Sequence, residues 1–172
     1  MSLNTDVADE VSLSTRPAWG AVFAMAFGVF SLITAEFLPI SLLTPIAHSL
    51  NVSEGLAGQT VTVTALIALF TSLTVGSVAG RIDRRVMMLA FSLLLIVSAL
   101  MVAFAANLTV ILLARVLLGV AIGGFWTLST AITMRLVPAD QVPRALSIVF
   151  SGISLATIIA TPLGSYLGGL VG

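Results

Sequence analysis

Residues 86–106 of this chain read VMMLAFSLLLIVSALMVAFAA, a run without a single charged side chain. An α-helix needs about 20 apolar residues to cross the roughly 30 Å hydrocarbon core of a bilayer, and this run is long enough. Strands of a membrane β-barrel alternate apolar and polar residues over about ten positions, and this run does not alternate. Residues 86–106 therefore predict a membrane-spanning helix.

Four further apolar runs lie on either side of it. The five expected spans cover residues 19–46, 56–80, 86–106, 108–136 and 145–171. The connections between them are too short for a soluble domain, so neighbouring spans must be antiparallel and adjacent. We expect an all-α integral membrane protein with five transmembrane helices in residues 18–172. Residues 1–17 are polar and are expected to form a cytoplasmic tail.

The composition excludes several classes of protein. Of the 172 residues 59% are hydrophobic and only 8% are charged, with a mean hydropathy of +1.19. Soluble domains are about 25% charged, so an ordinary cytosolic enzyme and a disordered tail are excluded. The seven basic and seven acidic residues balance, which leaves no electrostatic footprint for a nucleic acid. With no Cys and one His, we expect no metal site and no cofactor.

The arginines predict the orientation. If the spans alternate, six of the seven arginines fall on one side of the membrane, and the opposite loops contain none. The six are Arg16, Arg81, Arg84, Arg85, Arg135 and Arg144. Cytoplasmic loops carry an excess of basic residues, so a cytoplasmic N-terminus and an external C-terminus are predicted.

A short glycine pattern indicates an internal repeat. Gly76 and Gly80 end the second span as Gly164 and Gly168 end the fifth, at an offset of 88 residues. The same offset carries the start of the first span to the start of the fourth. Three-plus-three repeats build one half of many secondary transporters. The alternative is chance, because small residues four apart are common where membrane helices pack.

Two charged residues lie deep inside the expected spans. From the helical rise, Glu36 and Arg115 lie roughly 5 Å and 10 Å outward from the centres of the first and fourth spans. Charges at this depth usually face protein or a water-filled cavity. We interpret Glu36 as a carboxyl that binds and releases a proton, with Arg115 as its electrostatic partner. The alternatives are a structural carboxylate, and an arginine that snorkels or binds backbone carbonyls.

The fourth span also holds a glycine and aromatic cluster. Gly119 and Gly123 are spaced for close approach of a neighbouring helix. Gly124, Phe125 and Trp126 follow near mid-membrane, where the rings are candidates to line a substrate cavity and stack on a planar substrate. Ordinary packing or lipid contact is the alternative for either ring.

A charged turn and a proline complete the candidates. Arg81, Asp83, Arg84 and Arg85 form the tight turn between the second and third spans. Their mixed charge is interpreted as a gate that pins helix ends in one conformational state, or as a simple cytoplasmic anchor. Pro162 inside the fifth span removes a backbone hydrogen bond and is expected to kink the helix.

Three motifs resemble the major facilitator superfamily, in its drug:proton antiporter branch. They are GSVAGRIDRR at residues 76–85, RVLLG at residues 115–119 and ATPLG at residues 160–164. The family signature has Asp in place of Gly80, Gly in place of Asp83 and Gly in place of Thr161. Residues 36–39, 53–55, 123–126 and 134–138 are similar to those of bacterial family members that export purine ribonucleosides.

This resemblance implies proton-driven efflux across the bacterial inner membrane. The substrate would be a purine nucleoside or a drug-like small molecule, exchanged for protons. Family members have twelve spans, so this chain would represent the first five of a six-helix N-terminal half, and the rest of the transporter would be its missing partner. Five spans alone are not expected to transport, because alternating access rocks one half against the other.

Two other functions compete with transport. An intramembrane serine protease needs a His at the depth of its Ser, but His48 lies at a membrane boundary and is the only His. A small non-transporting membrane protein that associates through its glycine faces is the second alternative. A genuine stop codon after Gly172, with stable expression, would favour that alternative.

Overall fold

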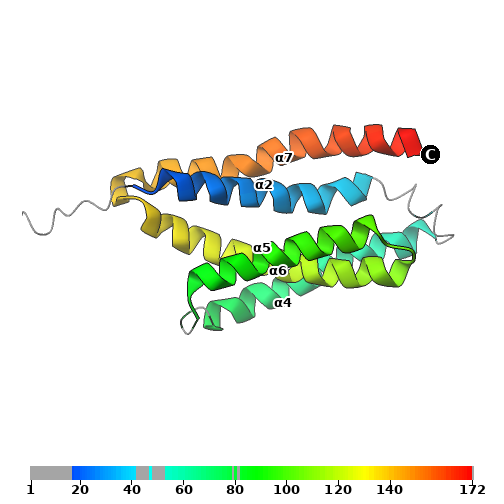
Figure 1. Ribbon diagram of the computed structural model, residues 1–172, viewed down its shortest axis with the longest axis horizontal. Helices are drawn as coiled ribbons and strands as arrows, with labels where there is room; N and C mark the ends of the chain where they lie inside the picture. Colours follow the sequence, from blue (N-terminus) through cyan, green and yellow to red (C-terminus); the bar gives the residue numbers. More distant parts are fainter. Residues whose placement is uncertain (1–16, 42–46, 48–52, 79, 81, 172) are drawn as a thin grey trace, which may run out of the picture.

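Five long helices form the computed structural model, which describes residues 17–41, 47, 53–78, 80 and 82–171 (Figure 1). The helices are α2 (Trp19–Ser41), α4 (Glu54–Val78), α5 (Arg84–Ala103), α6 (Leu108–Leu136) and α7 (Val142–Val171). A short 3-10 helix, η1 (Ala139–Gln141), joins α6 to α7. All five long helices are apolar and long enough to cross a membrane. The expected all-α fold with five membrane-spanning helices is therefore confirmed.

The helices begin and end close to the expected positions for local reasons. Asn107 accepts a hydrogen bond from the Val110 backbone N–H at 3.0 Å and so caps the start of α6. Asp83 caps α5 in the same way through the Arg85 N–H at 2.8 Å. The helix α2 continues through Pro39 as far as Ser41, where the described stretch stops; the expected run reaches residue 46.

The helices pack in two groups that share α6. The first group is the pair α2 and α7, which lie side by side along the upper edge of Figure 1. The second group consists of α4 and α5 packed against α6. The helix α6 also contacts α2 and α7, so it links the two groups.

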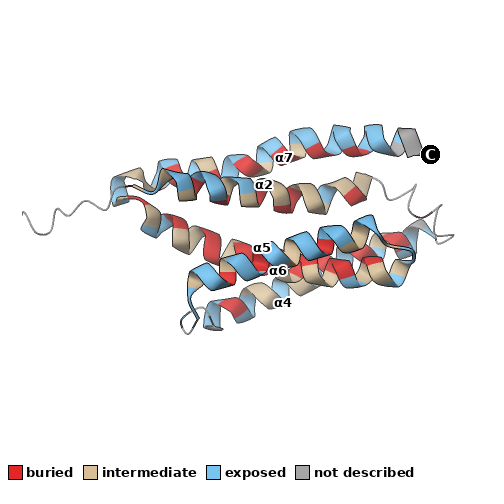
Figure 2. Ribbon diagram, in the orientation of Figure 1, coloured by how far each residue is buried: buried red, intermediate tan, exposed pale blue. Residues whose placement is uncertain are grey.

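Burial follows this arrangement. Buried residues are concentrated on α6, whereas the outer faces of α4, α5 and α7 are exposed and apolar (Figure 2). Leu73 and Leu89, for example, are 68% and 71% exposed. Large exposed apolar faces are unusual on a soluble monomer, but they are expected on helices that contact the hydrocarbon of a bilayer.

The helix pairing agrees with the repeat indicated by the glycine pattern. An offset of 88 residues relates α2 to α6 and α4 to α7. In a repeat, α6 is therefore the counterpart of α2 and α4 is the counterpart of α7, so the pair α2–α7 corresponds to the pair α6–α4. Both pairs are among the main helix contacts of the structure. The helices α2 and α7 run parallel, since Gly152 and Gly164 of α7 meet Ala26 and Leu38 of α2 in the same chain order. The two pairs thus have the relation expected of a repeat.

Candidate functional site

Glu36 on α2 and Arg115 on α6 lie near enough for their charges to influence each other, although no salt bridge within 4 Å joins these two described side chains. Glu36 is half-buried on α2, and the Arg115 side chain on α6 is only 2% exposed. Their opposite charges attract each other. Among the residues that the structure describes, none accepts a hydrogen bond from the buried Nε of Arg115. The two ionisable groups selected from the sequence therefore share one environment although they are far apart in the chain.

Arg115 lies beside a small space between the helices. This space holds about 10 Å³ and is lined by residues of α2, α4, α5 and α6, among them Pro39, Thr60 and Arg115. A volume of this order suffices for about one water molecule. The Thr60 hydroxyl donates to the Ala57 carbonyl at 2.7 Å, so it keeps lone pairs that can accept. A buried donor without an acceptor is costly.

The glycines of α6 are sites of close helix packing. A Cβ on Gly119 would lie 2.7 Å from the Thr64 carbonyl oxygen of α4, and one on Gly123 would clash with the Ala68 carbonyl. Gly124 instead faces the ring of Phe91 on α5. All three glycines are buried, so two neighbouring helices approach α6 closely on two different sides.

The two aromatic residues of the cluster have different surroundings. Phe125 is 4% exposed and its ring fills the space beside Gly28 of α2. Trp126 is half-buried and stacks on Phe150 of α7, with ring centroids 5.9 Å apart and planes inclined by 17°. Phe125 therefore packs in the core, whereas Trp126 belongs to an aromatic pair between two helices. Their roles toward a substrate stay predictions.

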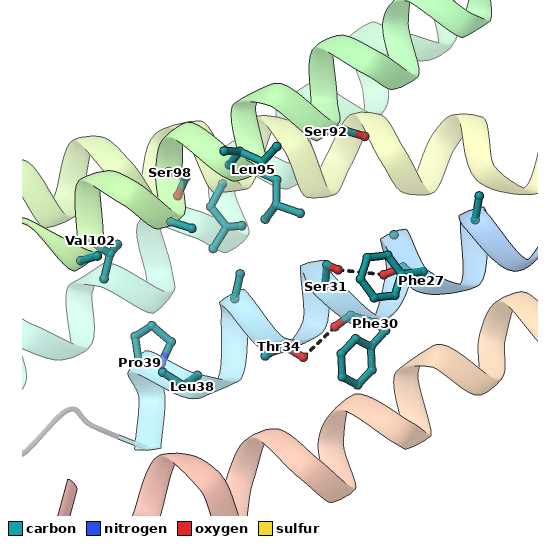
Figure 3. A pocket seen from close by; sticks show the side chains of 17 residues that line it. Phe27, Phe30, Ser31, Thr34, Leu38, Pro39, Ser92, Leu95, Ser98 and Val102 are labelled. Atoms are coloured by element: carbon teal, nitrogen blue, oxygen red, sulfur yellow. Dashed lines mark hydrogen bonds between the residues drawn. The ribbon is translucent and has the colours of Figure 1, made fainter. Parts of the chain in front are cut away.

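A cavity of about 850 Å³ lies between α2 and α5 (Figure 3) and shares the lining residues Pro39 and Val102 with the small space beside Arg115. Glu36, Arg115, Phe125 and Trp126 are not among its lining residues. Its hydroxyl groups donate to backbone carbonyls and belong to Ser31, Thr34, Ser92 and Ser98. The rest of the lining is apolar, so this space suits an apolar occupant better than a polar solute.

The charged turn is described only in part. Asp83 caps α5, Arg85 is exposed and Arg84 is half-buried, while Arg81 lies outside the described residues, as do Arg16 and His48. A gating role for the turn stays a prediction.

The remaining packing candidates divide into two sets. A Cβ on Gly164 would come within 2.7 Å of Ser41 on α2, whereas Gly76 and Gly80 have open space around them. Pro162 is exposed inside α7, which continues to Val171, and Gly168 lies near the end of the same helix.

Sequence reasoning missed the small-residue ridge of α7. Gly152, Ala156, Ala160 and Gly164 are all buried and recur every four residues, so they form one face that meets α2. Their four-residue spacing is a signal that the sequence already contains. It also missed Phe150, which lacks any local pattern because its partner Trp126 is on another helix.

The ends of α2, α6 and α7 are joined near η1. The Ala18 N–H donates to the Leu136 carbonyl at 2.9 Å. The Arg144 guanidinium lies 5.3 Å from the ring centroid of Trp19, a cation–π geometry. Arg144 therefore has a specific contact in addition to its place among the arginines that predict orientation.

Comparison with known proteins gives consistent matches. The chain is 52% identical over 172 residues to the purine ribonucleoside efflux pump NepI of Salmonella enteritidis PT4. The NepI proteins of Salmonella typhimurium LT2 and Salmonella typhi are also 52% identical over the same length. These alignments cover 99% of this chain and 43% of each relative, so the chain spans less than half the length of the relatives.

The family model of the Major Facilitator Superfamily matches residues 25–172, which include every described helix at least in part. The matched region contains Glu36, Arg115 and the glycine contacts described above. A match to this family indicates a multi-pass membrane transporter and not an enzyme. The chain therefore belongs to the Major Facilitator Superfamily.

Proposed function

We propose that this chain is part of a proton-coupled efflux transporter that exchanges purine ribonucleosides, or related small molecules, for protons. The observation that carries the proposal is that Glu36 and Arg115, one acidic and one basic residue deep in the spans, lie near enough for their charges to influence each other. The substrate class is suggested by the printed names of the Salmonella relatives, which are purine ribonucleoside efflux pumps.

The pair has the properties that proton coupling needs. Glu36 can change its charge, whereas arginine stays protonated in proteins. A cation such as Arg115 favours the ionised form of a nearby carboxyl, whereas burial favours its neutral form, so a change in either one can make Glu36 bind or release a proton. Water or substrate that enters between them weakens the attraction and allows Glu36 to take up a proton. Proton and substrate then favour different conformations of the carrier, which couples their movements.

The other predicted residues have supporting roles in this proposal. Trp126 contributes to substrate binding, with Gly123, Gly124 and Phe125 setting its position on α6. The charged turn of Asp83, Arg84 and Arg85, together with Arg81, stabilises one conformation of the carrier. The protein resides in the bacterial inner membrane with its N-terminus in the cytoplasm, as the arginine distribution predicts.

Glu36→Gln in the complete protein that contains this sequence tests the proposal. The amide keeps the size of the side chain but cannot exchange a proton at neutral pH. We expect wild-type vesicles to move radiolabelled guanosine against its gradient when a pH gradient is imposed. Glu36→Gln should abolish this pH-driven movement while purified protein still binds guanosine.

Asp140→Asn is the matched control. Asp140 is an exposed carboxylate in η1, so its loss should leave pH-driven transport close to wild type. Normal pH-driven transport by Glu36→Gln would show that Glu36 is structural or serves substrate recognition instead. Absence of any pH-driven guanosine movement by the wild type would refute the proposed function itself.

A further inference from the structure

The Trp126–Phe150 pair is a preformed aromatic surface. The two rings come from α6 and α7 and are nearly parallel, with planes inclined by 17° and centroids 5.9 Å apart. Offset stacking of this kind is a favoured arrangement of aromatic rings, so each ring limits the motion of the other. Phe150 is 40% exposed, so part of its ring stays free for a further contact.

The same side of α6 carries the proton-coupling candidate. With 3.6 residues per turn, Arg115, Ile122 and Trp126 project from one side of the helix, because 115 and 126 are close to three full turns apart. The rise along α6 places Trp126 about 16 Å from Arg115. This spacing is several times a hydrogen-bond length, so Arg115 and Trp126 occupy two separate positions along α6.

We infer that Phe150, together with Trp126, forms the stacking platform for the base of the transported nucleoside and sets a preference for purines. The inference rests on the proposed function and deepens it. A purine has two fused rings and covers more of an aromatic surface than a pyrimidine does, so stacking favours it. Trp126 orients Phe150, and the free part of the Phe150 ring contacts the base.

The 16 Å separation has a consequence for coupling. The base stacks at Trp126 and Phe150, about 16 Å along α6 from Arg115, while Glu36 binds and releases the proton near Arg115. Proton and base therefore do not compete for the same atoms, and they act on each other through the conformation of the carrier.

The test measures equilibrium binding of radiolabelled guanosine and uridine to the purified complete protein. Phe150→Leu removes the aromatic ring but keeps an apolar side chain, and Phe150→Tyr and Phe150→Trp keep a ring. Phe70→Leu is the matched control, since Phe70 lies on α4 and is 64% exposed on an outer face. Stacking on an aromatic ring contributes enough that its loss weakens binding about tenfold.

We expect Phe150→Leu to weaken guanosine binding about tenfold and to weaken uridine binding less, so that the purine preference falls. Phe150→Tyr and Phe150→Trp should restore guanosine binding, and Phe70→Leu should behave as wild type. Guanosine affinity within twofold of wild type in Phe150→Leu, or equal weakening of both nucleosides, overturns the platform.

The platform and the proposed function can fail separately. Suppose the wild-type protein binds guanosine through Phe150 but shows no pH-driven transport. That result refutes proton coupling and supports the platform. Wild-type protein that transports guanosine with a pH gradient, but is indifferent to Phe150→Leu, refutes the platform alone. Wild-type protein that binds no guanosine overturns the platform directly.

Discussion

Replacing Gly119 with Ala tests how closely α4 packs on α6. The added Cβ would lie 2.7 Å from the Thr64 carbonyl oxygen and 2.8 Å from Cβ of Ile67. Neither atom is the end of a flexible side chain, so the two helices must move apart. Overpacking of this kind costs about 1–3 kcal/mol.

A second glycine separates this steric cost from helix propensity. Ala is favoured over Gly inside a helix by about 1 kcal/mol, which partly offsets the clash at Gly119. Gly58 on α4 has no atom within 4 Å of an added Cβ, so Gly58→Ala gains the propensity without the clash. The difference in stability between the two variants is therefore the steric cost, about 1–3 kcal/mol.

The assay is the apparent melting temperature of the purified complete protein in detergent, followed by the loss of its monodisperse chromatographic peak. At about 2–4 °C per kcal/mol, Gly119→Ala should melt several degrees below Gly58→Ala. A Gly119→Ala protein that melts at or above Gly58→Ala would refute the close contact between α4 and α6.

Two further predictions follow from the turn and from a helix contact. Replacing Arg81, Arg84 and Arg85 with neutral residues should weaken the preference of the arginine-bearing loops for the cytoplasmic side, and loop-accessibility labelling should then detect a mixed topology. Unchanged topology would mean that the other arginines suffice to orient the chain. Ser98→Ala should remove the 2.8 Å hydrogen bond from Ser98 to the Ala114 carbonyl and cost about 0.6 kcal/mol. A melting temperature equal to wild type would contradict that contribution.

The fold class could be predicted from sequence because a membrane-spanning helix satisfies its own backbone hydrogen bonds. Each apolar run must form a helix regardless of the rest of the chain. The expected span at residues 108–136 coincides with α6, and the others differ from their helices by a few residues at the described ends.

The candidate site could be predicted only where burial has a large cost. Glu36 and Arg115 stand out in the sequence because a charge inside a span is expensive wherever it points. That the two residues lie near each other could not be predicted, because it depends on how α2 packs on α6. The lack of an acceptor for Nε of Arg115 among the described residues depends likewise on the side chains around it. Gly76 and Gly119 look alike in sequence, yet only Gly119 faces a neighbouring helix.

The number of spans, their lengths and the residues that are costly to bury in lipid follow from composition over one helix, so they can be read from the amino-acid sequence. Which helix faces meet is visible only in the folded chain, as in the contact of Trp126 with Phe150, the contact of Gly152 with α2 and the cavity between α2 and α5. Lipid is as apolar as the side chains, so hydrophobicity does not select a helix's partner. The close fit of small residues and a few polar contacts makes that choice, and these depend on residues far apart in the chain.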